Sequence, residues 1–466
     1  MTAHRRTYHI WTIGCQMNQA DSRYLSSQLE TLGYTPTDNA SRADLIILNT
    51  CVVRQQAEDK AYDRLRILKG LKTRQPGKTI AVMGCLVGRK SDASLLERFP
   101  FVDVFMPPSD TGPLLEHLEQ NGSASTGRVH DVRTRTTREM LQNGDGVMPE
   151  SERGRAVTAF VPVVLGCSYA CSYCVIPSRR GAERSRPREE ILEEVRKLAD
   201  HGVREVTVLG QIVDRYGMDL NGSSDLADLL TRVAGIDGIR RVRFLTSHPN
   251  WLSDRLLDTI ASTPGVCPLI EVPFQSGNDE ILERMKRGYT ADDYRRLVDR
   301  IRARTPDAAI HTDIIVGFPG ETEEQFMDSF HLLSELELDM AHIAKYSERP
   351  LTLAAEKYTD DVPADVKEQR RTLLEEVLAD ILEKKNRRLL GKEVEVLAED
   401  QGRNKRWRGR TVHGKLVFFE DDRDRLGQLV NVRVEWTAPF TLRGKAVDNE
   451  PSLTSERQEA ETHGHD

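Results

Sequence analysis

The chain contains 466 residues, 38% hydrophobic and 30% charged, with a formal net charge of −7; this predicts two to four domains of about 100–200 residues each and excludes nucleic-acid binding over the whole surface. It has no apolar run near the ~18 residues of a membrane span and no secretory signal pattern, and its seven cysteines are too few and odd in number for a secreted disulfide scaffold. We therefore expect a cytoplasmic protein, without a membrane partner, that keeps its thiols reduced.

Near the N-terminus, three apolar runs predict β-strands, and each run ends at a cysteine. They are YHIWTIGC, ADLIILNTC and KTIAVMGC, ending at Cys15, Cys51 and Cys85. Helical patterns at 20–33 and 55–71 separate them. Strands that alternate with helices predict a doubly wound parallel sheet, whose ligands bind outside the carboxyl ends of the strands. We therefore expect all three cysteines at one edge of this sheet, in a domain over residues 5–122.

Residues 123–152 are polar, contain glycine and lack periodicity, so we predict an interdomain linker. A second α/β series follows and predicts a partial (β/α)6 barrel over residues 153–384. Its strand candidates are residues 159–166, 204–210, 241–247, 268–274, 309–318 and 340–347, with helical patterns between them. A charged helical segment, 364–388, closes the series. Paired acids such as Glu323 and Glu324 stand at a helix start and are expected to be surface charges.

The segment after this helix has short strand patterns and little helix. We predict a small all-β barrel of the oligonucleotide-binding kind at 386–450 and a disordered tail at 451–466. The run QGRNKRWRGRTVHGK, from Gln401 to Lys415, contains no acidic residue. It predicts an RNA-binding hairpin, with Trp407 stacking on a base, or alternatively a solvated basic turn. The candidate RNA-binding residues are Arg403, Lys405, Arg406, Trp407, Arg408 and Arg410.

The sequence GCSYACSYC places Cys167, Cys171 and Cys174 directly after the first strand of the predicted barrel. On a helix these thiols would form one buried stripe, but Gly166, Pro177 and the β-branched pair after Cys174 favour a loop. A structural zinc site needs four ligands, and the fourth is missing nearby. A [4Fe–4S] cluster held by three thiolates would keep one iron open for chemistry.

The CxxxCxxC motif of this segment resembles that of radical S-adenosylmethionine (SAM) enzymes. Further motifs resemble the methylthiotransferases, with the MiaB group as the best match: GCQMNQADS, NTCVVRQQAEDKAYDRL, VMGC, CVIPSRRGAERSRP, QSGNDEILERMKRGYT and TDIIVGFPGETEEQF. The C-terminal segment resembles a TRAM domain, a small RNA-binding barrel. The resemblance covers about residues 5–450.

This resemblance implies two [4Fe–4S] clusters, one on Cys167, Cys171 and Cys174 and an auxiliary one on Cys15, Cys51 and Cys85. The first would cleave SAM to a 5′-deoxyadenosyl radical that removes hydrogen, and the second would present sulfur that a second SAM methylates. The implied reaction is methylthiolation at C2 of N6-isopentenyladenosine at position 37 of tRNA, in the anticodon loop. It also requires an electron donor and a sulfur donor, which the sequence does not identify. We expect a monomer.

The resemblance also suggests which residues contact SAM. Tyr173 matches an aromatic position near the adenine, and polar residues at the ends of barrel strands are candidates for further contacts: Gly210, Gln211, Ser247, Gln275 and Asp313. The chain departs from the family pattern at Ile212, Glu271 and Leu351, where Asn, His and Gly are usual. Cys267 belongs to no motif, and we expect it to be a packed core thiol.

Two alternatives remain at this point. Sibling methylthiotransferases modify threonylcarbamoyl-adenosine in tRNA or an aspartate of a ribosomal protein, and the GCQMNQADS motif favours the isopentenyladenosine group over them. A function of another class is a non-catalytic RNA-binding protein with thiols held by zinc, which would be colourless rather than brown.

Overall fold

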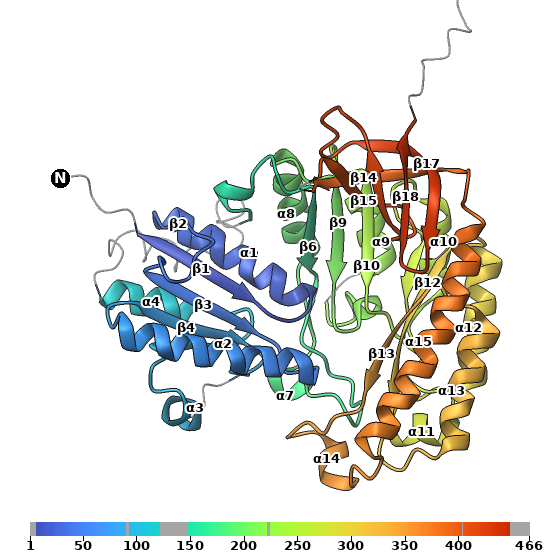
Figure 1. Ribbon diagram of the computed structural model, residues 1–466, viewed down its shortest axis with the longest axis horizontal. Coiled ribbons are helices and arrows are strands. Elements are labelled where there is room, and N and C mark those ends of the chain that lie inside the picture. The colour runs from blue at the N-terminus through green and yellow to red at the C-terminus, as the bar shows by residue number, and fades with distance from the viewer. Residues whose placement is uncertain (1–5, 90–92, 122–146, 221–223, 403, 448–466) are drawn as a thin grey trace, which may run out of the picture. The chain divides into compact units, whose positions relative to one another are not determined.

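The structure is a computed structural model that describes residues 6–89, 93–121, 147–220, 224–402 and 404–447 (Figure 1). The chain divides into two compact units, residues 1–378 and 379–466. The predicted linker lies mainly outside the described residues, and the predicted tail lies wholly outside them. Val147 and Met148, at the C-terminal end of the predicted linker, are buried.

The first unit begins with a five-stranded parallel sheet in the order β2-β1-β3-β4-β5. Its strands are β1 (Thr7–Thr12), β2 (Thr35–Pro36), β3 (Leu45–Thr50), β4 (Thr79–Gly84) and β5 (Val104–Met106). This is a doubly wound order: β2 is added on one side of β1, and β3, β4 and β5 are added in turn on its other side. The predicted sheet is confirmed, and β2 and β5 are edge strands that the sequence patterns did not identify.

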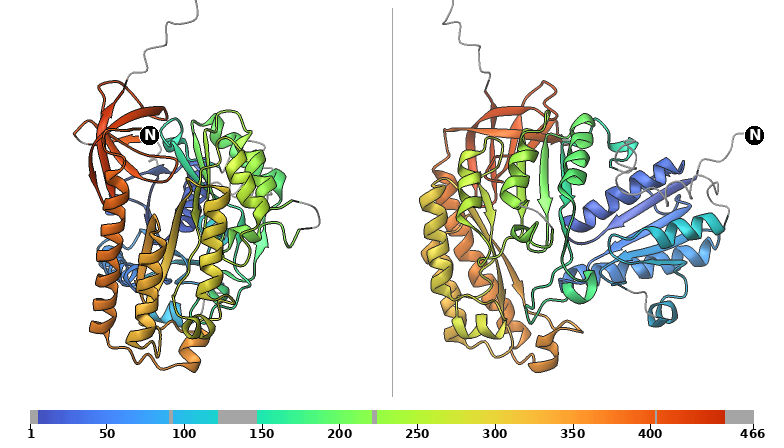
Figure 2. Two further views of the ribbon diagram at one scale, coloured as in Figure 1. Left: turned by 90° about the vertical axis from the view of Figure 1, so that its right-hand side faces the viewer. Right: turned by 180° about the vertical axis from the view of Figure 1, so that it is seen from behind.

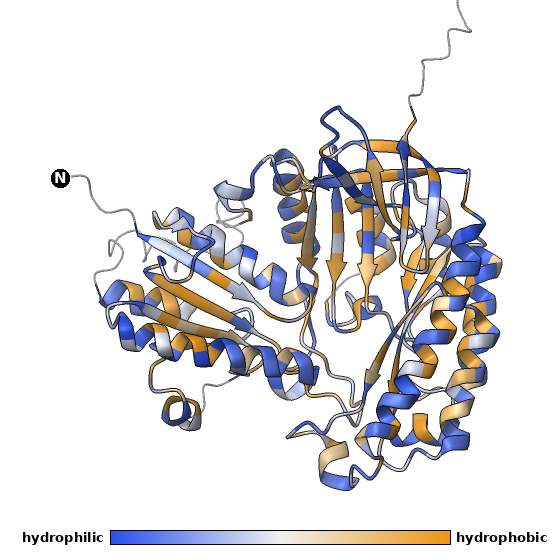
Figure 3. Cartoon of the chain, in the orientation of Figure 1, coloured by the Kyte–Doolittle hydropathy of each residue, from blue (hydrophilic) through white to orange (hydrophobic). Residues whose placement is uncertain are grey.

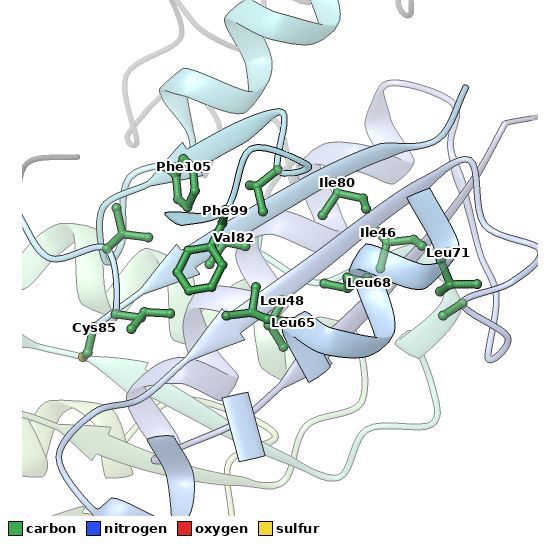
Figure 4. Packing of buried hydrophobic residues seen from close by; sticks show 14 of the residues in the cluster. Ile46, Leu48, Leu65, Leu68, Leu71, Ile80, Val82, Cys85, Phe99 and Phe105 are labelled. Carbon is green, nitrogen blue, oxygen red and sulfur yellow. The ribbon is translucent and has the colours of Figure 1, made fainter. Parts of the chain in front are cut away.

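Helices cover both faces of this sheet. Helices α1 (Gln16–Thr31) and α4 (Gly112–Gln120) pack against one face, and α2 (Gln55–Arg74) and α3 (Ala93–Arg98) against the other. Figure 4 shows Leu65, Leu68 and Leu71 of α2 packed on the inner strands, with Cys85 at one end of the cluster. Because β3 is buried on both faces, its first four residues are all apolar, and Figure 3 shows it as a mainly hydrophobic arrow between amphipathic helices.

Six further strands form two parallel three-stranded sheets, β10-β9-β6 and β11-β12-β13. They are β6 (Thr158–Pro162), β9 (Glu205–Leu209), β10 (Arg241–Leu245), β11 (Leu269–Glu271), β12 (Ala309–Val316) and β13 (Met340–Lys345). A bridge between Val242 and Val266 joins the two sheets, and the Cys267 N–H donates to the Val242 carbonyl at 2.9 Å. The predicted six-stranded barrel is therefore confirmed (Figure 2), and Cys267 is buried in it as expected.

Helices pack outside the barrel strands in alternation with them. They are α8 (Arg188–Asp200), α9 (Leu226–Ala234), α10 (Asp254–Ser262), α12 (Ala291–Arg304) and α13 (Glu323–Leu336). Thr290 and Thr322 begin α12 and α13 with capping boxes, which satisfy the first free N–H groups of each helix. Glu323 and Glu324 lie in the first turn of α13, as predicted.

A buried ionic cluster joins the N-terminal sheet domain to the barrel. The Glu194 carboxylate of α8 is fully buried and accepts hydrogen bonds from Arg23 Nη2 at 3.1 Å and Tyr24 Oη at 2.5 Å, both on α1. Its other oxygen accepts from Arg186 Nη1 at 2.8 Å. The Glu194 carboxylate therefore pairs with two guanidinium groups, one from each domain.

The second unit contains the end of α15 (Ala364–Arg387) and a closed five-stranded barrel in the order β14-β15-β16-β18-β17. The strands are β14 (Glu393–Gln401), β15 (Arg406–Arg410), β16 (Leu416–Glu420), β17 (Leu429–Ala438) and β18 (Thr441–Ala446). Alternate residues fill the barrel interior, among them Val396, Val417 and Phe419. The predicted small all-β barrel is confirmed.

Leu351 carries backbone strain in an exposed loop. It has φ of +69°, and its side chain is 68% exposed. A left-handed conformation costs a residue with a Cβ about 1–2 kcal/mol, and burial of the Leu351 side chain offsets little of this cost. We expect Leu351→Gly to raise the free energy of unfolding by about 0.5–1 kcal/mol in urea titrations, after the greater chain entropy of unfolded glycine is subtracted. Leu351→Ala keeps the strain, so an equal gain there would contradict this explanation.

Candidate functional site

The three N-terminal cysteines follow three adjacent strands of the sheet. Cys15 follows β1 and stands directly before α1, while Cys51 and Cys85 follow β3 and β4. Glycines allow the strand ends to approach closely: a Cβ on Gly14 would lie 2.5 Å from Cys51 Cβ, and one on Gly84 would lie 2.5 Å from the Thr50 carbonyl oxygen. The prediction that these cysteines share one sheet edge is confirmed.

Their surroundings suit sulfur ligands. Burial, followed by the charges of Cys85 and Cys15, raises the pKa of Cys51 to about 11, which indicates that the three thiols lie within electrostatic reach of one another. The Val53 N–H points at Cys51 Sγ at 3.5 Å, and Cys15 Sγ donates to Asn18 Oδ1 at 3.3 Å. Without a metal, burial keeps these thiols neutral, and they would be deprotonated on binding metal.

The barrel cysteines lie on a loop whose two ends are fastened together. Strands β7 (Val164–Leu165) and β8 (Arg184–Ser185) pair antiparallel, and the Cys167 N–H donates to the Gly181 carbonyl at 3.0 Å. Gly166 has φ of +70°, and a Cβ there would lie 2.6 Å from the Gly181 oxygen and closer still to the Ala182 oxygen. The loop is not helical at 167–174, which excludes a buried helical stripe of thiols.

Donors also surround the barrel thiols. Arg287 is buried, and its Nη1 donates to Cys171 Sγ at 3.1 Å while its Nε donates to Tyr289 Oη at 3.0 Å. The Tyr169 N–H points at Cys167 Sγ at 3.4 Å. Burial and then the charge of Cys171 raise the pKa of Cys174 to about 12. Arg287 was not among the predicted site residues, although it stands within the motif QSGNDEILERMKRGYT.

The arrangement of the thiols bears on the zinc alternative. Among the residues that the structure describes, no three Cys, His, Asp or Glu side chains converge closely enough to hold one metal ion, as the zinc alternative requires. In a [4Fe–4S] cluster each thiolate binds a different iron, so the thiols stand further apart. N–H groups directed at sulfur are the usual surroundings of such ligands.

Most of the proposed SAM residues follow the ends of barrel strands, but Asp313, predicted at a strand end, lies within β12, three residues before its last residue. Ser247 and Gln275 are buried, and neither Ser247 Oγ nor Gln275 Oε1 has a partner within the described part of the chain. Gln275 has φ of +64°, and Thr246 has φ of +70°, which is strained for a β-branched residue. Unused polar atoms and strained backbone at strand ends are typical of a ligand site. A Cβ on Gly210 would lie 2.9 Å from Val213 Cα.

Two further proposed residues have clear neighbours. Tyr173 packs beside an apolar cluster that includes Met285, Phe318 and Tyr346. Asp313 pairs with Arg54 Nη2 at 3.5 Å, and Arg54 belongs to the N-terminal domain, three residues after Cys51. An arginine next to one cysteine set therefore reaches the barrel strands of the other. Gln211 is half-buried and lies two residues after the end of β9.

Glu271, where the family pattern has His, gives a pH-dependent prediction. Burial, followed by the charge of Asp313, raises its pKa to about 7, against the opposing charge of Arg54. Between about pH 4.5 and 7 the folded chain therefore binds more protons at this site than the unfolded chain, and the free energy of unfolding falls as pH rises. We expect Glu271→Gln to gain stability relative to wild type across that window in urea titrations. Glu324→Gln removes an exposed glutamate as a control, and a constant Glu271→Gln difference would contradict the assignment.

The prediction that Trp407 stacks on RNA is wrong. Its side chain is only 4% exposed and packs in the interior of the C-terminal barrel. Its Nε1 donates to the carbonyls of Asp421 and Arg423, both at 3.2 Å. The basic residues around it predict a surface position, but alternation along β15 turns its side chain inward. Trp436 and Phe440, which were missed, are exposed on the same unit, and Arg443 stacks on Trp436 at 4.5 Å.

The basic hairpin also has acidic neighbours just outside the run from Gln401 to Lys415. Arg406 pairs with Glu420 at 3.0 Å, and Arg408 pairs with Asp400 at 2.5 Å. Arg410 lies 3.6 Å from Glu399. These are exposed pairs, which contribute about 0–1 kcal/mol and can be exchanged for phosphate contacts. Lys405 is exposed at the turn, and Arg403 lies outside the described residues.

Three family models match the chain: an uncharacterised protein family, UPF0004, over residues 7–107, the radical SAM superfamily over 161–333 and the TRAM domain over 387–447. A relative from Chloroflexus aurantiacus, named tRNA-2-methylthio-N(6)-dimethylallyladenosine synthase, is 42% identical over 447 residues, 95% of this chain and 92% of the relative. The chain belongs to the MiaB group of radical SAM methylthiotransferases. As a radical SAM enzyme, this methylthiotransferase uses SAM and a [4Fe–4S] cluster.

Further similarities agree with this assignment. A protein of the same name from Dehalococcoides mccartyi is 43% identical to this methylthiotransferase over 95% of its chain and 98% of the relative. The radical SAM methyltransferase TsrM from Kitasatospora setae, solved with cobalamin and a [4Fe–4S] cluster, superposes with a TM-score of 0.54 at 15% identity, covering 75% of this chain and 77% of that one. That likeness concerns the fold alone. In the described residues, no helix has the length and apolar character needed to span a membrane.

Proposed function

We propose that this methylthiotransferase converts N6-isopentenyladenosine at position 37 of tRNA to its 2-methylthio derivative. The observation that carries the proposal is the presence of two separate thiol triads, one at the end of the N-terminal sheet and one on the loop between β7 and β8. Relatives that match nearly the whole chain carry the name of this activity. The C2 carbon is not activated for acid–base chemistry, so a radical route is required.

Each triad would hold one [4Fe–4S] cluster. When bound, the barrel cluster with SAM supplies hydrogen abstraction, and the N-terminal cluster supplies a place for the sulfur that a second SAM methylates. The chain itself provides thiolates, N–H donors to sulfur and buried polar atoms for SAM. Tyr173, Gly210, Gln211, Ser247, Gln275 and Asp313 are the residues that we propose line the SAM site. All seven cysteines are free, which suits a reducing cytoplasm.

The contact from Arg54 to Asp313 supports a short path between the two clusters. It joins the segment after Cys51 to β12 of the barrel. Reacting atoms need near-contact geometry, so a base held between the clusters must meet both. An anticodon-loop base can be extruded into such a site more cheaply than a paired base.

For the C-terminal barrel we propose an electrostatic contact with tRNA. The proposed residues are Lys405, Arg406, Arg408 and Arg410. Arg403, which lies outside the described residues, is proposed from the sequence alone. If Arg406 and Arg408 contact phosphates, the plot of log affinity against log salt should lose about 0.7 of slope for each contact removed. We expect Arg406→Gln/Arg408→Gln to flatten that slope in binding titrations with tRNA. An unchanged slope would reject this role, and Arg433→Gln, on β17 of the same barrel, is the control.

The substrate is tested by turnover. Anaerobically reconstituted enzyme, supplied with SAM, dithionite and sulfide, is incubated with isopentenylated tRNA, and the nucleosides are identified by mass spectrometry. We expect 2-methylthio-N6-isopentenyladenosine, none from tRNA without the isopentenyl group, and none with Cys51→Ala. If product formed only on tRNA bearing threonylcarbamoyl-adenosine, or only on a ribosomal protein, the enzyme would instead be assigned to one of the sibling methylthiotransferase groups.

A further inference from the structure

Arg180 belongs to the barrel, but its charged end lies among residues of the N-terminal domain. It is the last residue of the short helix α7 (Ile176–Arg180), six residues after Cys174. Its Nη2 lies 3.3 Å from Asn18 Oδ1 and 3.4 Å from Asp21 Oδ2. Its side chain is 3% exposed. A guanidinium buried so deeply needs compensating negative charge or acceptors.

The acceptors provided by Asn18 and Asp21 do not use all of its donors. Arg180 Nε is buried without a partner within the described residues. The same guanidinium interacts with the Cys85 thiol and lies within electrostatic reach of Cys15 and Cys51. Burial acts to lower the pKa of Arg180, but the charges of Asp21, Cys85 and Cys15 outweigh it and raise that pKa.

We infer that Arg180 is a positioning residue for the N-terminal cluster, delivering a buried positive charge and a donor to its thiolates from the segment that ligates the barrel cluster. The inference rests on the two-cluster arrangement proposed above. A [4Fe–4S] core bound by three thiolates is net negative, and its reduction adds another negative charge. A buried cation beside it therefore favours the reduced state and raises the midpoint potential.

The segment makes this a link between the two sites. The β7–β8 pairing fastens residues 166–183 into a closed loop, and that loop carries three thiols for one cluster and the arginine for the other. In the opposite direction, Arg54 extends from the segment of Cys51 to Asp313. Order in the barrel loop would thus be required for the N-terminal cluster to have its full charge compensation.

A purely structural role for Arg180 would be to pair with Asp21, and two variants separate the roles. Arg180→Gln and Asp21→Asn break the same ion pair, so a structural role predicts effects of the same sign. The electrostatic role predicts opposite signs, because one variant removes a positive charge near the thiolates and the other removes a negative charge. Arg179→Gln, one residue earlier in α7, is the matched control, and Arg180→Lys should restore most of the wild-type potential.

The experiment is a redox titration of the full reconstituted chain followed by electron paramagnetic resonance, with Cys51→Ala identifying the signal of the barrel cluster. We expect Arg180→Gln to shift the N-terminal cluster to a more negative potential, Asp21→Asn to shift it to a more positive one, and the barrel cluster to stay unchanged in both. Shifts of the same sign, or none, would overturn the inference. If Arg180→Gln fails to assemble the N-terminal cluster, loss of that cluster in Asp21→Asn as well would favour the structural role. Wild-type protein with only one cluster would instead reject the two-cluster proposal.

Discussion

Gly166→Ala is expected to remove the barrel cluster while leaving the N-terminal one in place. Alanine at φ of +70° would itself cost about 1–2 kcal/mol. The larger effect is steric, because the added Cβ would overlap the carbonyl oxygens of Gly181 and Ala182, which lie on the opposite end of the cysteine loop. Backbone atoms cannot rotate away as a side chain can, so the loop must open.

Iron content measures this result directly. Reconstituted wild-type protein should hold about eight irons per chain from two cubanes, and Gly166→Ala about four, with no product formed on isopentenylated tRNA. Gly154→Ala is the matched control, since Gly154 has the same φ of +70° with no atom within 4 Å of the added Cβ. Equal iron content and activity in the two variants would show that the loop closure does not hold the cluster.

Glu194→Ala is expected to lower the free energy of unfolding by about 3–5 kcal/mol, since removing one partner from a buried ion cluster leaves the opposite charges uncompensated. Arg186 is left without its carboxylate in the barrel, and Arg23 and Tyr24 lose theirs at the domain interface. The effect should therefore be seen both in overall stability and in the contact between the two domains.

Urea unfolding, together with limited proteolysis between the domains, tests this expectation. Glu193→Ala is the matched control: the neighbouring glutamate on α8 pairs with Arg196 at 3.3 Å on the surface, and such pairs contribute about 0–1 kcal/mol. If the two alanine variants unfold at the same urea concentration, the buried cluster contributes no more than a surface pair.

Much of this arrangement could be predicted from sequence because its signals are local. Three strands that end in cysteine and a fourth followed by CxxxCxxC fix the cysteines at the ends of strands. The arginines near the thiols could not be predicted in the same way, because nothing near Arg180 or Arg287 in sequence indicates which distant sulfur it approaches. The prediction that Trp407 stacks on RNA was wrong for a related reason: its basic neighbours are exposed, but the period of two along β15 turns the tryptophan inward.

The acidic partners of the basic hairpin illustrate the same limit. Glu399 and Asp400 directly precede the basic run and Glu420 follows it shortly, and the antiparallel pairing of β14 and β16 with β15 brings all three beside the arginines. A count of charges within one sequence window therefore overstated the local positive charge. Burial also gives Glu271 a pKa of about 7, which depends on the packing of several strands and has no signature in the residues next to it.

Arg23, Arg54 and Arg180 each pair with an acid of the other domain, and this limits which N-terminal domains and barrels can be combined in one chain. A chimaera that joined its first 120 residues to the barrel of a distant relative would have to preserve the matching acid for Arg54 and for Arg23, and the barrel would have to bring its own arginine to Asp21. A mismatch at Arg23 or at Asp21 would bury an isolated charge, whereas Arg54 is largely exposed and would lose only its partner. The two halves are therefore expected to be inherited together, and substitutions at these positions should occur as compensating pairs.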